Sequence, residues 1–259
     1  MTKYLENEEI VSWAGQLRLC YITSLTSSTC KYFVYSGKEF MKNVFTSLSV
    51  LLLLVTITSC AQKRKQVSEP HLSTKALSKY SQATFAAGCF WHEEALFESI
   101  KGVKEAISGY AGGNANNPSY ETLETGTTGH AETVNVYYDS SVVDYPTLLK
   151  VYFSGQDPTQ VNGQGPDHGT QYRSILFYRN EKEKQLAQDY IKSMHASGKY
   201  DKPIVVQLMP FTKFWMAENY HQNYIDNNPG SGYVQIVSIP EIKKLQKEYP
   251  NLIKPDHVY

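Results

Sequence analysis

The chain has 259 residues, 41% hydrophobic and 19% charged, so it is long and apolar enough to bury a full globular core. Its formal net charge of zero argues against a nucleic-acid-binding protein, which needs a basic surface to meet the phosphate backbone. The four cysteines, Cys20, Cys30, Cys60 and Cys89, fit no zinc pattern, which needs close pairs. They also fit no disulfide framework, since none follows Cys89.

The first element expected in chain order lies in residues 41–60, MKNVFTSLSVLLLLVTITSC. Its apolar run has the length of a secretory signal, whereas a bilayer span takes about 20 apolar residues. The ending Ile57-Thr58-Ser59-Cys60 resembles a bacterial lipobox, in which the cysteine carries a lipid. We therefore expect a lipoprotein signal peptide at 41–60 and lipidation at Cys60. The protein would then be anchored to a membrane of the cell envelope and face the periplasm or the exterior.

Other interpretations of this region stay open. The apolar run also fits a buried helix, and the positive-inside rule would place the basic Lys63-Arg64-Lys65 in the cytoplasm. A signal peptide should open a protein, so we expect residues 1–40 to be a non-native upstream extension, with translation starting at Met41. Residues 61–80 are polar and rich in Lys and Ser, which predicts a flexible tether before a folded domain at 81–259.

Within that domain the residue patterns alternate between strands and helices. Strands are expected at 83–87, 133–138, 172–178 and 204–208, and helices at 89–100, 144–153, 181–195 and from Pro240 onward. Glu93 and Glu94 fall in the first turn of the first helix, where acidic groups suit the helix dipole. The pattern predicts an α+β fold, a two-layer, ferredoxin-like sandwich of a mixed β-sheet with helices and long functional loops. The stretch 155–169 has four Gly and two Pro, and a loop of that length in a compact domain is usually functional.

Cys89 stands where a strand ends, a glycine permits a sharp turn and a helix begins. The free N–H groups and the positive dipole end of that helix would stabilise a thiolate, which favours a nucleophile. The neighbouring Phe90 and Trp91 would wall an apolar pocket. The alternative is that Cys89 is a buried small hydrophobe and that the two aromatic rings belong to the core.

Five ordered blocks resemble the peptide methionine sulfoxide reductase A family. They are Gly88-Cys89-Phe90-Trp91, Asn117-Pro118-Ser119-Tyr120, Thr128-Gly129-His130-Ala131-Glu132, Gln164-Gly165-Pro166-Asp167-His168-Gly169-Thr170-Gln171-Tyr172-Arg173-Ser174 and Ala217-Glu218-Asn219-Tyr220-His221-Gln222. Together they span roughly residues 83–227, which is nearly the whole domain. The resemblance implies an enzyme that reduces methionine-S-sulfoxide, free or in proteins, to methionine.

The resemblance also implies the role of each site residue. Cys89 attacks the sulfoxide sulfur and Glu132 protonates the oxygen, which otherwise leaves poorly. Tyr120 and Tyr172 hydrogen-bond that oxygen, and Asp167 positions a water or the thiol. Phe90 and Trp91 hold the methyl group of the substrate. No metal and no cofactor are implied, and His130 and His221 are expected to be hydrogen-bonded structural residues.

Departures from the family pattern concern the regeneration of the enzyme. Thr125 stands where many relatives carry a second cysteine, and the C-terminal segment holds none of the recycling cysteines common in the family. A sulfenic acid on Cys89 would therefore be reduced by an external thiol, from a thioredoxin-like or glutaredoxin-like partner or a small molecule.

Two alternatives of other classes remain. A cysteine hydrolase would need a histidine oriented as a base toward Cys89, and His92 is the nearest in sequence. A non-enzymatic lipoprotein that binds a ligand in an aromatic groove would leave the Cys89 thiol inert.

Overall fold

The computed structural model describes residues 72–259, except for the side chain of Thr74. The predictions for residues 1–40, for the signal segment 41–60 and for Cys60 lie outside the described residues. The end of the predicted tether is described, and it contains the short helix α2 (Thr74–Leu77), in which Leu77 is buried. Within residues 72–259, no helix is both long and apolar enough to cross a bilayer.

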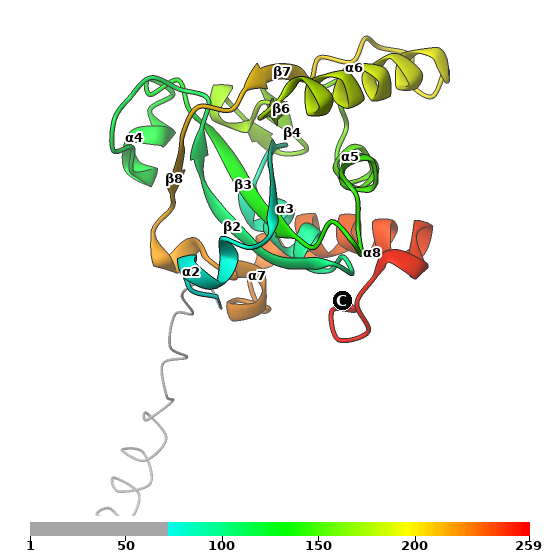
Figure 1. The fold of residues 1–259 in the computed structure, drawn as a ribbon. Coiled ribbons are helices and arrows are strands. Elements are labelled where there is room, and N and C mark those ends of the chain that lie inside the picture. The colour runs from blue at the N-terminus through cyan, green and yellow to red at the C-terminus, as the bar shows by residue number, and fades with distance from the viewer. Residues whose placement is uncertain (1–71) are drawn as a thin grey trace, which may run out of the picture. The chain divides into compact units, whose positions relative to one another are not determined.

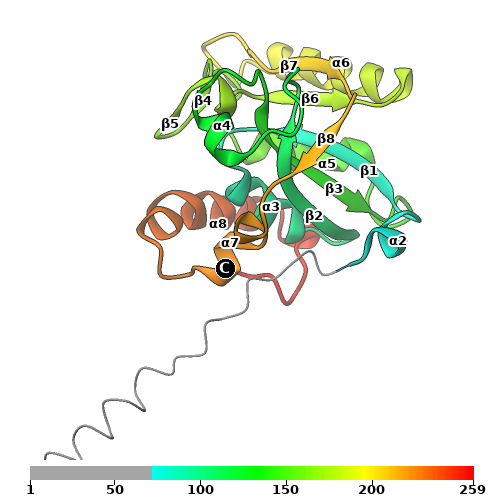
Figure 2. The same cartoon turned by 90° about the vertical axis from the view of Figure 1, so that its left-hand side faces the viewer.

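A six-stranded mixed sheet forms the centre of the domain, with the strand order β7-β6-β1-β3-β2-β8 (Figures 1 and 2). The strands are β1 (Ser81–Ala86), β2 (Val103–Ala111), β3 (Ala131–Tyr138), β6 (Ile175–Tyr178), β7 (Gln207–Pro210) and β8 (Phe214–Met216). Neighbouring strands are antiparallel except β6 and β7, which are parallel.

The inner part of this sheet has the predicted ferredoxin-like connectivity. Strand β1 leads into helix α3 (Phe90–Glu98) and strand β2, and strand β3 leads into helix α5 (Tyr145–Ser154) and strand β6. Strand β3 lies between β1 and β2, which is the split βαβ arrangement. The α+β prediction with a mixed sheet is therefore confirmed, and β7 and β8 extend the sheet at its two edges.

Longer and shorter elements surround this unit. Helix α6 (Glu181–Ala196) follows β6, and a π-helical turn η3 (Val234–Ser238) runs directly into helix α8 (Ile239–Glu248). The short elements are α4 (Tyr120–Glu124), β4 (Gly163–Gln164), β5 (Asp167–His168), η1 (Thr170–Tyr172), η2 (Asn219–His221), α7 (Tyr224–Asn227) and η4 (Pro250–Leu252). Most of them belong to the long loops, as predicted.

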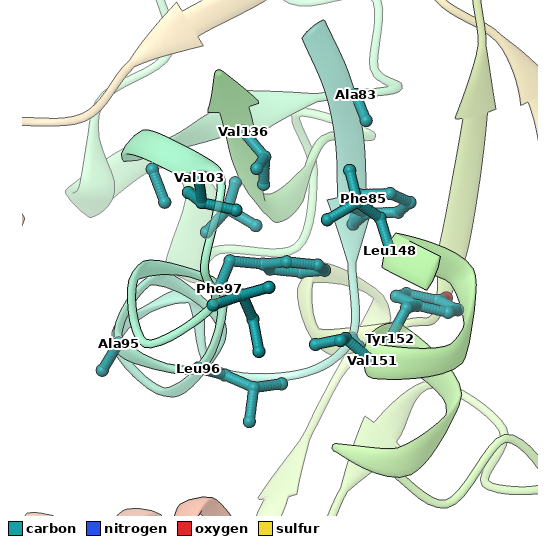
Figure 3. Packing of buried hydrophobic residues seen from close by; sticks show 14 of the residues in the cluster. Ala83, Phe85, Ala95, Leu96, Phe97, Val103, Val136, Leu148, Val151 and Tyr152 are labelled. Atoms are coloured by element: carbon teal, nitrogen blue, oxygen red, sulfur yellow. The ribbon is translucent and has the colours of Figure 1, made fainter. Parts of the chain in front are cut away.

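The main core lies between β1 and the two helices α3 and α5 (Figure 3). The Phe85 ring of β1 stacks on Phe97 of α3 with centroids 4.8 Å apart and lies 5.4 Å from the ring of Tyr152 of α5. All three side chains are buried. Burying a large apolar side chain stabilises the fold by about 1.5–3 kcal/mol, so these rings fix both helices on the sheet.

Two strands begin later in the chain than the sequence analysis predicted. The strand expected at 172–178 begins only at Ile175, because Thr170–Tyr172 forms a 3₁₀ turn that ends the long loop. The strand expected at 204–208 is β7, displaced to Gln207–Pro210, and its proline is tolerated because β7 is an edge strand.

Four glutamates of α3 and β2 are buried, although charged residues usually lie on the surface. Glu93, Glu94, Glu98 and Glu105 are each at most 6% exposed. Only Glu93 lies in the first turn of α3, and both Glu93 and Glu94 are buried, so the expected solvated interaction with the helix dipole is wrong. Burial raises the pKa of Glu93 and Glu94 well above the usual range, and raises that of Glu98 to about 8. The carboxyl groups of Glu93, Glu94 and Glu98 therefore hold their protons at neutral pH.

Candidate active site

Cys89 lies at the junction between β1 and α3, as predicted. Gly88 turns the chain with a φ of +82°, and a Cβ at this position would lie 2.5 Å from the Cβ of Gln164. Only glycine meets both conditions without strain. Cys89 is the N-cap residue of α3 and has a free thiol that is 9% exposed.

The electrostatic expectation for Cys89 is wrong, because burial outweighs the helix N-terminus. Burial raises the pKa of the thiol well above its ordinary value, and the nearby carboxylate of Glu132 adds to the rise. A hydrogen bond between the thiol and the Tyr233 hydroxyl acts in the opposite direction and lowers the pKa. The thiol therefore holds its proton at neutral pH, and it would have to lose that proton before the sulfur could act as a nucleophile.

Glu132 reaches the same helix terminus from strand β3. Its Oε2 accepts a hydrogen bond of 2.9 Å from the backbone N–H of Phe90, the residue after the cysteine. The side chain is 2% exposed, and burial raises its pKa well above the usual range. A buried carboxyl that keeps its proton at neutral pH can act as a general acid.

Tyr120 and Tyr172 share the surroundings of Glu132 although they come from separate loops. Tyr120 begins helix α4, and Tyr172 ends the turn η1. The Tyr172 hydroxyl donates a 3.1 Å hydrogen bond to Glu124, a residue that the sequence analysis did not single out. Burial raises the pKa of both hydroxyls, and the charge of Glu132 adds to the rise. Both phenols therefore stay protonated and can donate hydrogen bonds.

Asp167 is joined to Cys89 through Tyr233, a residue that the sequence analysis missed. The Tyr233 hydroxyl donates a 2.5 Å hydrogen bond to Asp167 Oδ2 and also hydrogen-bonds the sulfur of Cys89. Burial raises the pKa of Asp167, which is half-buried. Tyr233 follows a Gly-rich stretch with no hydrophobic pattern, so its aromatic ring was the only sequence signal that could have suggested a role.

The rings of Phe90 and Trp91 form an aromatic cluster beside the cysteine, in which Phe90 is buried in the core and Trp91 packs against it. The Trp91 ring stacks on Tyr224 with centroids 3.6 Å apart, and its Nε1 donates a 3.0 Å hydrogen bond to His221 Nδ1. The Phe90 ring lies 4.8 Å from His221 and 6.4 Å from Tyr120. These contacts hold both rings in fixed orientations.

His221 and His130 are hydrogen-bonded inside the protein, as predicted. Burial lowers the pKa of His221 to about 4, so its ring is neutral and its Nδ1 can accept the Trp91 N–H. His130 accepts from the backbone N–H of Gly113 at 3.0 Å, and its Nε2 lies 2.8 Å from the carbonyl of Ala115. Among residues 72–259 no group of three potential ligands is arranged to hold a metal ion.

Glu218 supports the tyrosines of the site, although its role could not be predicted from its family block. It accepts 2.6 Å from the Tyr110 hydroxyl and 3.0 Å from the backbone N–H of Tyr120. Tyr120 is thereby fixed at the start of α4. The structure thus brings together all of the predicted site residues that it describes, namely Cys89, Phe90, Trp91, Tyr120, Glu132, Asp167 and Tyr172.

A cavity of about 500 Å³ reaches Cys89 from one side. Near the sulfur it is lined by Asp167, Tyr233 and His92, and it extends to Lys199 and Lys244. The aromatic cluster and Glu132 are not part of its wall. His92 Nε2 lies 3.2 Å from the carbonyl of Gly155 and not against the sulfur, which disfavours the pairing with Cys89 that a cysteine hydrolase needs.

Comparison with known sequences points to one family. A sequence model of the family described as peptide methionine sulfoxide reductase matches residues 81–252. The chain is 45% identical over 167 residues to peptide methionine sulfoxide reductase MsrA of Natronomonas pharaonis, covering 64% of this chain and 94% of that protein. It is 46% identical over 164 residues to the protein of the same name from Picrophilus torridus, covering 63% and 92%.

Comparison with solved structures gives the same result for the fold. The reduced form of Mxr1 from Saccharomyces cerevisiae matches with a TM-score of 0.55 and 32% identity, covering 63% of this chain and 92% of that one. Methionine sulfoxide reductase A of Corynebacterium diphtheriae matches with a TM-score of 0.52 and 32% identity, covering 57% and 74%.

Proposed function

The chain belongs to the peptide methionine sulfoxide reductase family, and from that premise we propose that it reduces methionine-S-sulfoxide, free or in proteins, through the thiol of Cys89. In the first step the sulfur of Cys89 attacks the sulfoxide sulfur while Glu132 gives its proton to the sulfoxide oxygen. Methionine leaves, and the oxygen stays on Cys89 as a sulfenic acid. The preference for the S epimer follows from the family resemblance.

Two proton positions support this sequence of steps. Glu132 holds a proton before substrate binds, because its burial raises the pKa of the carboxyl. Cys89 must lose its proton to attack, and the Tyr233 hydroxyl links the sulfur to the carboxylate of Asp167. Asp167 accepts the thiol proton through this tyrosine, so acid and base lie on different sides of the cysteine.

The substrate is oriented by the groups around Glu132. Tyr120 and Tyr172 donate hydrogen bonds to the sulfoxide oxygen, and the rings of Phe90 and Trp91 surround the methyl group. Because Trp91 is fixed by Tyr224 and His221, the apolar wall is preorganised.

The observation that carries the proposal is the hydrogen bond between buried Glu132 and the Phe90 N–H, which brings an acid to the cysteine within this family fold. The test is reduction of a mixture of methionine sulfoxide epimers with dithiothreitol, resolved by epimer. We expect loss of the S epimer alone and no turnover by Cys89→Ser that remains folded. Substantial turnover by that variant would reject the mechanism.

We also propose that the protein is a lipoprotein of the cell envelope, anchored through Cys60. The support is the sequence of residues 41–60, with its short apolar run and lipobox-like ending. Metabolic labelling with a fatty acid should mark the wild type and not Cys60→Ala. The variant should leave the membrane fraction while its reductase activity stays unchanged, and a wild type found free in the cytoplasm would reject the anchor.

A further inference from the structure

The cavity beside Cys89 has no role in the sulfoxide reaction as proposed. We propose that it binds a low-molecular-weight thiol built on an amino acid or short peptide, which reduces the sulfenic acid of Cys89 directly. This inference rests on the proposed function for the origin of the sulfenic acid. It adds the chemical class of the reductant and the place where that reductant binds.

The position of the cavity separates the thiol from the sulfoxide. The cavity wall includes Cys89, Asp167 and Tyr233 but not Glu132 or the aromatic cluster of Phe90 and Trp91. A thiol attacks sulfur in line with the bond that breaks, so it enters away from the departing oxygen. Entry past Asp167 and Tyr233 leaves the oxygen on the side of Glu132.

The size and depth of the cavity favour a small molecule. A volume of about 500 Å³ falls within the roughly 300–1,000 Å³ of sites for small ligands. Cys89 is 9% exposed, so a thiol on a flat protein surface meets it less readily than a thiol that enters the cavity.

The lining groups match a molecule that carries both charges of an amino acid. Lys199 and Lys244 can bind a carboxylate, and Asp157, Glu241 and Glu248 can bind an ammonium group. Lys244 already lies 3.4 Å from Glu241, so the two charges form a mixed pair beside the cavity. The buried amide nitrogen of Gln156 has no hydrogen-bond partner among the described residues, so it and the amide of Gln160 suit the peptide groups of a short peptide.

The reaction balances with two molecules of thiol. The first forms a sulfur–sulfur bond to Cys89 and breaks the sulfur–oxygen bond, and the oxygen leaves as water with the proton of the attacking thiol. The second attacks the mixed disulfide, takes the first thiol away as an oxidised dimer and returns the Cys89 thiol. The enzyme is reset without a second cysteine of its own.

The test uses the full chain with Cys20, Cys30 and Cys60 replaced by Ser, so that hydrogen peroxide at alkaline pH generates the sulfenic acid on Cys89 alone and the result is independent of sulfoxide turnover. Its decay is followed with L-cysteine or glutathione, and separately with uncharged 2-mercaptoethanol. Lys199→Ala and Lys244→Ala should each slow the charged thiols roughly tenfold and leave 2-mercaptoethanol unchanged. Lys243→Ala is the matched control, since Lys243 is exposed on the same helix and does not line the cavity.

A second variant tests the volume itself. Gln160→Trp should fill the cavity and slow cysteine and glutathione more than tenfold, while the first turnover with methionine sulfoxide keeps its wild-type rate. Equal thiol rates in wild type and all cavity variants would overturn the inference. A change in the sulfoxide rate alone would also overturn it, because the cavity would then serve the substrate. Absence of sulfoxide reduction in the wild type would reject the proposed function instead.

Discussion

At the scale of single residues, Glu132 decides whether the buried cysteine can act on a sulfoxide. Glu132→Gln keeps the shape and the acceptor for the Phe90 N–H but cannot deliver a proton. A general acid typically contributes about 10²–10⁴-fold, so sulfenic acid formation should slow by that order in single-turnover kinetics. Glu121→Gln, an exposed glutamate of helix α4, serves as the control and should react as wild type. Unchanged kinetics in Glu132→Gln would leave this carboxyl a structural role only.

The hydroxyl of Tyr233 should control how easily Cys89 loses its proton, because it contacts both Cys89 and Asp167. Its hydrogen bond lowers the pKa of the thiol against the effect of burial. Tyr233→Phe should therefore raise that pKa further, lower the rate near pH 7 and move the alkaline rise of the pH–rate profile to higher pH.

The control for this effect is Tyr220→Phe, since Tyr220 is 51% exposed and its ring packs on His221 and not on the cysteine. A Tyr233→Phe profile that coincides with wild type would show that the link to Asp167 does not assist deprotonation. A loss of rate at all pH values without a shift would assign Tyr233 to packing.

At the scale of elements, the turn between β1 and α3 places the cysteine. Gly88→Ala meets two penalties, a φ of +82° and a Cβ only 2.5 Å from Gln164 Cβ. Gly198→Ala, at the end of α6, meets only the first, because its φ is +65° and nothing lies within 4 Å. Both should lose about 1–2 kcal/mol for the left-handed backbone. Gly88→Ala should lose more in urea unfolding and should also lower activity, and equal losses would contradict the clash.

The packing of α3 on β2 should make stability depend on pH through Glu98. Burial raises its pKa to about 8, and the Glu98 Oε1 accepts from the Ala106 N–H at 3.3 Å. The folded state holds this proton between about pH 4.5 and pH 8 while the unfolded chain does not. The contribution is thus fully present below about pH 4.5 and is lost as the pH rises through about 8.

The slope from this one group is at most about 1.4 kcal/mol per pH unit. Glu98→Gln removes the titration, so the variant should gain stability relative to wild type between pH 5 and pH 8.5. Chemical denaturation at several pH values measures this difference. Parallel stability curves for the two proteins would show that Glu98 does not hold its proton in the fold.

Sequence patterns predicted elements well where one face is apolar and failed where both faces are buried. Helix α6 was expected at 181–195 and spans Glu181–Ala196, because its charged residues alternate with a half-buried apolar stripe that packs on the core. Strand β2 was missed, since eight of its nine residues are buried and include Glu105, Ser108 and Gly109, which break any alternation. A strand buried on both faces carries no periodic signal of its own.

At the scale of the whole molecule, the site residues meet because the ferredoxin-like connectivity brings distant segments to one end of α3. Cys89 follows β1, and Glu132 is the second residue of β3, which pairs with β1 in the sheet. Tyr120, Tyr172 and Asp167 arrive on loops whose conformation no local pattern predicts. The family blocks identified those three residues, whereas Tyr233 and Glu124 lay outside the quoted blocks and became visible only through their hydrogen bonds.

Regeneration is the property of the whole chain that the arrangement of thiols determines. Residues 72–259 contain a single cysteine, Cys89, and its thiol is free. A sulfenic acid on Cys89 therefore meets no second cysteine within residues 72–259, and we expect an external thiol to resolve it. One turnover with methionine sulfoxide and no reductant should leave Cys89 reactive toward dimedone in nearly every molecule. Mass spectrometry under non-reducing conditions should then find the dimedone adduct and no disulfide within the chain. A disulfide from Cys89 to Cys20, Cys30 or Cys60 would overturn this scheme, and the corresponding Cys→Ser variant would show whether that cysteine resolves the acid or traps it by chance.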